Sequence, residues 1–170
     1  REALQKGLLV IIGKEVDDAY TKMVLQLMVD PDTVRRNGDK LSIVYTPLHG
    51  SGNLPVRRAL KEAGFTRVHV VPEQELPDPN FSTVKAPNPE DPAAFTLAIP
   101  QARELGATII LGTDPDCDRL GVCALDSQGE YRTLSGNQIG CLLLHHILSS
   151  KQKDGSLPKN AAAVKSIVST

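Results

Sequence analysis

The chain has 170 residues, with 19 Lys and Arg against 20 Asp and Glu, so its formal net charge is −1. This balance gives no electrostatic support for a nucleic-acid partner or an anionic membrane, and no apolar run reaches the roughly 20 residues that cross a bilayer. Hydrophobic residues make up 41% and charged residues 23%, which argues against a disordered chain. The three cysteines lack a metal-finger spacing and suit a reducing compartment, so we predict a cytoplasmic protein.

The first part of the chain alternates between helix and strand patterns. Apolar residues from Val16 to Met28 recur at helical spacing, and Pro31 is expected to end that helix. Gly64 supplies the left-handed residue that commonly terminates a helix. The predicted elements, in order, are a helix over 16–28, a polar loop over 35–40, a strand over 41–46, a turn over 47–52, a helix from that turn to Ala63 and a strand over 67–71.

The second part begins with a proline-rich stretch over 72–92 that can hold little regular structure, because proline removes backbone donors. Asp91 and Pro92 have the pattern of a helix start, and Pro100 should kink that helix or end it early. Ser135 and Gln138 form a capping-box pattern. The predicted elements are a helix over 92–105, a strand over 108–111 buried on both faces, strands over 120–125 and 131–134 around a turn, a helix that starts after Ser135, a polar linker over 149–160 and a strand over 162–168.

Strands that alternate with helices favour an α/β fold whose sheet is mainly parallel and covered on both faces. The two strands around the turn at 126–129 add an antiparallel hairpin at one edge. We therefore predict a three-layer α/β/α fold with a mixed, mainly parallel sheet and an antiparallel edge hairpin.

The most informative segment is residues 112–119, which read GTDPDCDR. Asp114, Asp116 and Asp118 follow a buried strand at every second position, and ligand sites of open α/β sheets lie just past such strand ends. Three crowded carboxylates repel one another, and a divalent cation would relieve that repulsion. Magnesium prefers hard oxygen ligands and often binds substrate phosphate as well. Arg119 adds a planar fork suited to phosphate, so the set points to phosphoryl transfer.

Other interpretations of this segment stay open. It could be a solvated acidic turn. An EF-hand fits poorly, because Arg119 and Leu125 stand where its glycine and its glutamate belong. An aspartyl-phosphate hydrolase would use Asp114 as its nucleophile, but the second acidic cluster that it needs does not follow.

Two neighbouring features have structural explanations. His49 lies in a tight turn between Pro47 and Gly50, which favours a structural hydrogen bond over a role as general base. Gly50 and Gly52 could cradle a phosphate, but a simple turn explains them as well.

Residues 113–122, TDPDCDRLGV, resemble the magnesium loop of the α-D-phosphohexomutases, the phosphoglucomutase and phosphomannomutase enzymes. Pro115 stands where many members have glycine, a variant most similar to the phosphoglucomutase branch that includes phosphopentomutase. Further segments resemble the family's second domain in the expected order: GKEVDDAY over 13–20, YTPLHG over 45–50, FSTV over 81–84, PNPE over 87–90 and LSGN over 134–137.

The resemblance implies a role for each residue of the acidic loop. Asp114, Asp116 and Asp118 would be the three Mg²⁺ ligands, and Arg119 would face the phosphoserine or the transferred phosphate. The parent enzyme would move phosphate between the 1-position and the terminal hydroxyl of an aldose phosphate, with glucose, ribose or mannose phosphate as substrate. A non-catalytic module that binds magnesium or a phosphosugar is the alternative.

The family's serine loop and its sugar- and phosphate-binding loops belong to other domains, and their motifs do not occur here. The resemblance therefore implies an excised second domain that is inactive alone. We expect residues 1–13 to be an entry segment from a first domain, residues 14–148 the metal-binding domain, residues 149–160 a linker and residues 161–170 the first strand of a following domain.

Overall fold

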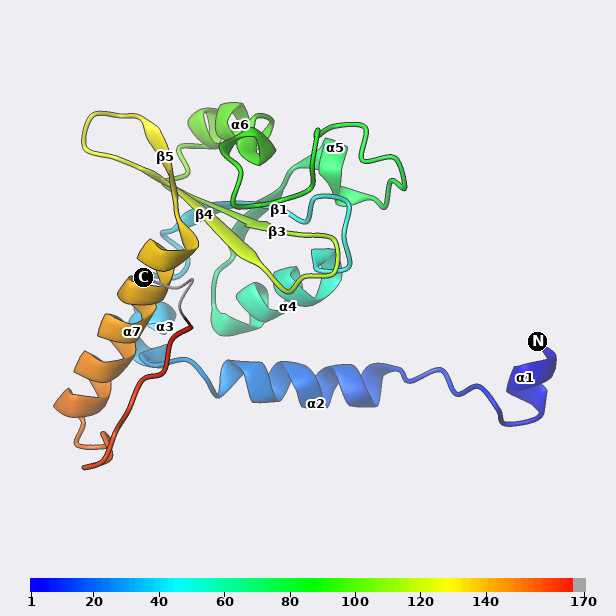
Figure 1. Ribbon diagram of the computed structural model, residues 1–170, viewed down its shortest axis with the longest axis horizontal. Helices are drawn as coiled ribbons and strands as arrows, with labels where there is room; N and C mark the ends of the chain where they lie inside the picture. The colour runs from blue at the N-terminus through cyan, green and yellow to red at the C-terminus, as the bar shows by residue number, and fades with distance from the viewer. Residues whose placement is uncertain (167–170) are drawn as a thin grey trace.

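The computed structural model describes residues 1–166 and contains one five-stranded sheet in the order β2-β1-β3-β4-β5 (Figure 1). The strands are β1 (Ser42–Thr46), β2 (Arg67–Val70), β3 (Ile109–Thr113), β4 (Leu120–Leu125) and β5 (Tyr131–Leu134). β1 pairs in parallel with β2 and β3, whereas β3–β4 and β4–β5 pair antiparallel. The predicted mixed sheet with an antiparallel edge hairpin is confirmed.

Helices cover both faces of this sheet. α6 (Ala98–Leu105) contacts β1 and β3 on one face, and α4 (Asn53–Ala63) contacts β2 on the opposite face (Figure 1). α2 (Lys14–Leu25) packs on the outside of α4, where Arg58 forms an ion pair with Asp18 at 2.5 Å. The arrangement is the predicted three-layer α/β/α fold.

The core lies between the sheet and α6. Its buried side chains include Val44 of β1, Phe95, Ala98 and Ala102 beside the sheet, and Ile110 of β3. Because side chains alternate along a strand, Ile110 enters this core while Ile109 and Leu111 face the other layer and are only partly buried. The strand is thus fully buried on one face rather than on both.

A short helix after α2 was not expected from the sequence. α3 (Pro31–Asn37) occupies part of the predicted polar loop, and α2 already ends at Leu25. The Asp30 side chain accepts a hydrogen bond from the Thr33 backbone N–H at 2.9 Å, so Asp30 is an N-cap. Pro31 therefore starts a helix, because its missing N–H has no helical partner at the first position.

The segment predicted as one kinked helix is divided in two. A 3₁₀ turn, η1 (Pro92–Phe95), precedes α6, and the Asp91 carboxylate caps it by accepting from the Ala93 N–H at 2.9 Å. The break falls before Pro100, which lies in the first turn of α6 where a proline is tolerated. The proline-rich stretch before η1 contains only the single turn α5 (Pro72–Glu75) among its helices and strands.

α7 (Gly136–Lys153) has the predicted capping box and extends into the segment predicted as a linker. Residues 149–153 are polar but compatible with a helix, so polarity alone did not mark the helix end. Gly155, with φ of 78°, follows the helix. α7 also carries apolar side chains that remain exposed, among them Leu142 and Leu143.

The two ends of the described chain pack little. α1 (Glu2–Gln5) and all other residues up to 13 are exposed (Figure 1). Residues 162–166 carry no strand, and the rest of the strand predicted over 162–168 lies outside the described residues. Within residues 1–166, the helices are too short or too polar to cross a bilayer.

Candidate metal centre

The acidic loop over 114–119 joins β3 to β4. Its two ends are neighbours in the sheet, because Thr113 pairs with Leu120 in the antiparallel ladder. The turn over 47–52 follows β1, which is parallel to β3, so both segments leave the same edge of the sheet. The loop therefore occupies the edge at which ligand sites of α/β folds occur.

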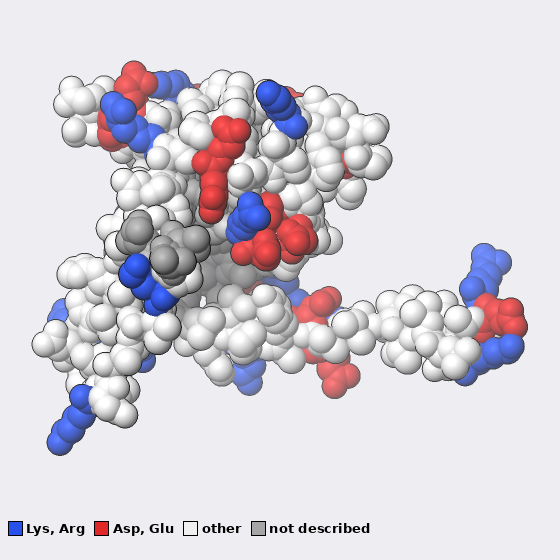
Figure 2. Space-filling model, viewed as in Figure 1, with Lys and Arg blue, Asp and Glu red and all other residues white. Residues whose placement is uncertain are grey.

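The structure brings the three predicted ligands together. One carboxylate oxygen from each of Asp114, Asp116 and Asp118 lies within 4.8 Å of the other two. Figure 2 shows acidic side chains gathered beside a basic one over the turn between β3 and β4. Two oxygens bound to one Mg²⁺ at about 2.1 Å lie at most about 4.2 Å apart, a separation that side-chain rotation can reach. An all-oxygen, all-anionic donor set suits this ion.

Asp114 is the buried member of the set and is held by the loop itself. The backbone N–H groups of Asp118 and Arg119 donate to its Oδ1 at 3.1 and 3.0 Å. Burial raises the pKa of Asp114, but these N–H groups and the neighbouring carboxyls outweigh it, and the pKa is lowered. The loop thus favours an ionised Asp114.

Asp118 shows the cost of crowding the carboxylates. Its hydrogen bond with Asp114 and the charges of Asp116 and Asp114 raise the pKa of Asp118. A cation bound between these groups would replace that repulsion with attraction.

Arg119 lies at the end of the loop with a half-exposed side chain. Its Nε is 3.8 Å from Asp114 Oδ2, so the guanidinium lies beside the carboxylates and also reaches solvent. A group held there can contact an anion that approaches the loop. All four predicted site residues are therefore on one loop.

The turn over 47–52 supports the acidic loop through contacts that the sequence did not indicate. Ser51 donates to the Pro115 carbonyl oxygen from its backbone N–H at 2.8 Å and from Oγ at 3.0 Å. Tyr45 and Thr113 share a buried hydrogen bond of 2.8 Å below the loop. In this turn the sequence drew attention only to Gly50 and Gly52. In the structure, these glycines allow the turn to pack closely against the acidic loop.

His49 has the structural environment expected of it. Its Nδ1 lies 2.8 Å from the Leu76 carbonyl oxygen and its Nε2 lies 2.8 Å from Thr83 Oγ1. The side chain is buried, and the backbone has φ of 65°. Both ring nitrogens thus tie the turn over 47–52 to the loop over 76–84, and both have their partners outside the acidic loop.

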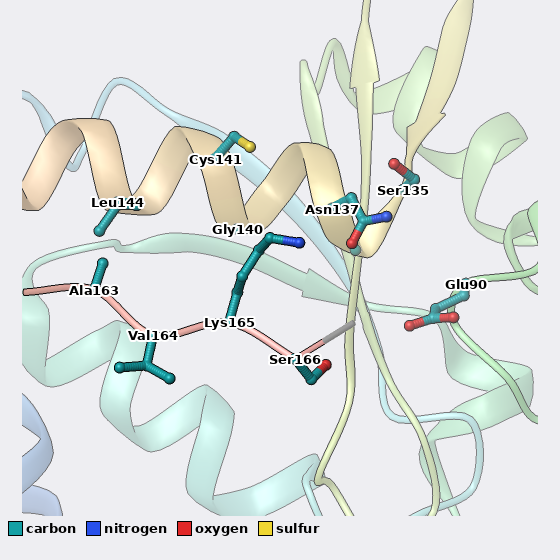
Figure 3. Close-up of a pocket in the computed structure, with 11 residues that line it drawn as sticks. Glu90, Ser135, Asn137, Gly140, Cys141, Leu144, Ala163, Val164, Lys165 and Ser166 are labelled. Carbon is teal, nitrogen blue, oxygen red and sulfur yellow. The ribbon is translucent and has the colours of Figure 1, made fainter. Parts of the chain in front are cut away.

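A separate cavity of about 1050 Å³ lies between the first turns of α7 and residues 163–166 (Figure 3). Lys165 points toward α7, and Glu90 lies near the start of the same helix. The described lining contains none of the four predicted site residues, so this cavity is distinct from the candidate metal centre.

A family model described as phosphoglucomutase/phosphomannomutase, alpha/beta/alpha domain II, matches residues 18–127. A Haemophilus influenzae protein named as a phosphomannomutase is 39% identical over 149 residues, which cover 87% of this chain and 30% of the relative. A phosphoglucomutase of Staphylococcus haemolyticus is 42% identical over 159 residues, which cover 93% of this chain and 27% of the relative. The chain thus spans less than a third of the length of these curated relatives.

A solved structure shows the same fold. It is described as a phosphomannomutase from Thermus thermophilus, and it matches 68% of this chain and 25% of its own with a TM-score of 0.51 and 22% identity. The acidic loop lies inside the segment that the family model covers. The matched segment makes up well over half of this chain. The chain therefore belongs to the phosphoglucomutase/phosphomannomutase family and contains the second, α/β/α domain of these enzymes.

Proposed function

We propose that this chain is the magnesium-binding domain of a phosphosugar mutase. The parent enzyme moves phosphate between the 1-position and the terminal hydroxyl of an aldose phosphate through a phosphoserine outside this chain. The observation that carries the proposal is the meeting of three carboxylates within 4.8 Å on a loop of a mutase-family domain.

Each residue of the loop has a part in this proposal. Asp114, Asp116 and Asp118 hold the cation, which when bound neutralises charge on the transferring phosphoryl group. Asp114 is oriented by two backbone N–H groups and enters the site ionised. Arg119 presents a planar fork to the phosphate from the side of Asp114.

Finer details are part of the same proposal. We infer glucose, ribose or mannose phosphate as the substrate of the parent enzyme, because the homologues are phosphoglucomutases and phosphomannomutases. A cytoplasmic location agrees with three cysteines that are all free thiols. Pro115, which stands where many members of the family have glycine, favours the phosphoglucomutase branch that includes phosphopentomutase.

Metal binding is tested on the 170-residue chain by titration calorimetry with MgCl₂. We expect weak binding, of millimolar class, because three carboxylates without a phosphate leave water to complete the octahedron. Asp116→Asn should abolish the binding, whereas Asp39→Asn changes an exposed carboxylate elsewhere and should leave it unchanged. Tight binding that survives Asp116→Asn would remove the assignment.

Catalysis is tested by conversion of glucose-1-phosphate to glucose-6-phosphate, repeated with ribose and mannose phosphates. The chain alone should show no turnover with or without Mg²⁺, because donor, acceptor and charge-stabilising groups must be positioned together. In the full-length parent, Asp116→Ala should lower kcat by about a hundredfold or more. Turnover by the 170 residues themselves would show that the chemistry lies in other residues.

The same assay separates the proposal from its alternative. A parent that binds Mg²⁺ but converts none of the three sugar phosphates would be a binding module. Arg119→Lys in the parent should lower kcat as well, since lysine keeps the charge but loses the planar fork.

A further inference from the structure

The peptide between Pro115 and Asp116 is held from outside the acidic loop. Its carbonyl oxygen accepts two hydrogen bonds from Ser51, one from the backbone N–H at 2.8 Å and one from Oγ at 3.0 Å. The pyrrolidine ring restricts the φ angle of Pro115, and the held carbonyl restricts its ψ angle. Together they set the direction in which the chain enters Asp116.

The glycines beside Ser51 make this contact possible. A Cβ on Gly50 would lie 2.4 Å from Pro115 Cα and 2.6 Å from its carbonyl oxygen. A Cβ on Gly52 would lie 2.7 Å from both Thr113 Oγ1 and the Tyr45 hydroxyl oxygen. The turn therefore approaches the acidic loop more closely than side chains at these positions would permit.

The loop's own hydrogen bonds converge on a different residue. The N–H groups of Asp118 and Arg119 donate to Asp114 Oδ1, and the Cys117 N–H donates to the Asp114 carbonyl oxygen at 3.0 Å. Asp114 is thus fixed from within the loop, and Asp116 is exposed. The backbone leading into Asp116 is the part that Ser51 holds.

We propose that Ser51 is a positioning residue of the metal centre, which fixes Asp116 relative to Asp114 and thereby favours Mg²⁺ over Ca²⁺. The inference rests on the proposed function, because it needs a cation at the three carboxylates. Mg²⁺ demands near-ideal octahedral geometry, whereas Ca²⁺ accepts longer and more variable ligand distances. A loosened Asp116 therefore costs Mg²⁺ more than Ca²⁺.

The test follows the backbone amide signals of the acidic loop by ¹⁵N NMR while the 170-residue chain is titrated with MgCl₂ or CaCl₂. Ser51→Ala should weaken Mg²⁺ binding about fivefold and Ca²⁺ binding less than twofold, since one of two hydrogen bonds to the carbonyl is lost. Ser51→Gly removes the same hydroxyl and should give the same result. Ser51→Thr keeps a hydroxyl and should restore the wild-type ratio of affinities.

The matched control is Ser149→Ala, which removes an exposed hydroxyl on α7 that donates to the His146 carbonyl and should leave both affinities unchanged. An unchanged ratio in Ser51→Ala, or an equal loss for both ions, would overturn the role of Ser51. Absence of Mg²⁺ binding in the wild-type chain would instead overturn the proposed function, and this inference with it. The ratio of affinities distinguishes positioning from general damage, which would weaken both ions alike.

Discussion

Gly121 of β4 is the glycine with the closest approach to another segment. A Cβ at this position would lie 2.0 Å from the Pro89 carbonyl oxygen, a backbone atom that cannot rotate away. Gly121→Ala should therefore destabilise the chain by about 1–3 kcal/mol, as overpacking of well-packed sites does. Urea unfolding followed by circular dichroism measures the change.

Gly140→Ala is the matched control for that substitution. Gly140 lies inside α7, and a Cβ there meets nothing within 4 Å. Alanine should favour this helix by up to about 1 kcal/mol. Equal stability of the Gly121→Ala variant and the wild type would mean that the 87–90 segment does not rest on β4.

Because Tyr45 is buried, the free energy of unfolding should depend on pH in the alkaline range. Burial raises the pKa of Tyr45 to about 12, and the hydrogen bond with Thr113 opposes this effect without outweighing it. The folded state thus binds the phenolic proton more tightly than the unfolded state, whose tyrosines titrate near pH 10. The difference between the pKa of Tyr45 in the folded state and in the unfolded state stabilises the fold. This contribution is fully present below pH about 10 and is lost as pH rises toward 12.

Tyr45→Phe isolates that effect. At neutral pH the variant should be about 1 kcal/mol less stable, because Thr113 loses its buried partner. The gap should narrow between pH 10 and pH 12, since only the wild type has this phenol to ionise. Urea midpoints at several pH values measure the gap, with Tyr20→Phe, an exposed tyrosine, as control. A gap that stays constant to pH 12 would contradict the burial of the phenol.

At the scale of elements, α7 is a long helix with a defined start and little packing. Ser135 Oγ accepts from the Gln138 N–H at 3.3 Å, and Gln138 Oε1 accepts from the Ser135 N–H at 2.8 Å. Ser135→Ala removes one of these bonds and should cost the helix about 1 kcal/mol. Because α7 contacts little besides β4, we expect faster amide exchange in its first turns and an unchanged Tm.

Hydrogen exchange with mass spectrometry measures this local change, with Ser149→Ala as the control at the other end of the helix. A lowered Tm in Ser135→Ala would show that α7 is part of the cooperative core.

The sequence indicated most elements, and the exceptions have physical reasons. The acidic loop was predictable because its four site residues lie within six consecutive positions after a buried strand. The start of α3 was missed because Pro31 is compatible both with a helix end before it and with a helix start at it. Ser51 was missed because its partner Pro115 is 64 positions away, and no local pattern reports a contact at that separation.

At the scale of the whole molecule, we expect the fold to be independent of the first residues. Residues 1–13 are all exposed, and the region that packs begins with α2. A chain that starts at residue 14 should therefore keep the Tm of the 170-residue chain within about one degree, because exposed termini add little stability. Differential scanning calorimetry of the two chains is the measurement. A clearly lower Tm for the shorter chain would show that this segment docks on the domain.

The pairing of Thr113 with Leu120 has a consequence for the thermodynamics of ligand capture. The sheet already joins the two ends of the acidic loop. The entropy of closing the loop is therefore lost on folding, before any ion binds. Binding of a metal ion should therefore order few residues of the acidic loop and should give a small heat-capacity change. Sites that fold around their metal behave differently. A hairpin that keeps its ends together without the ion can exchange that ion quickly, because release does not require the loop to unfold.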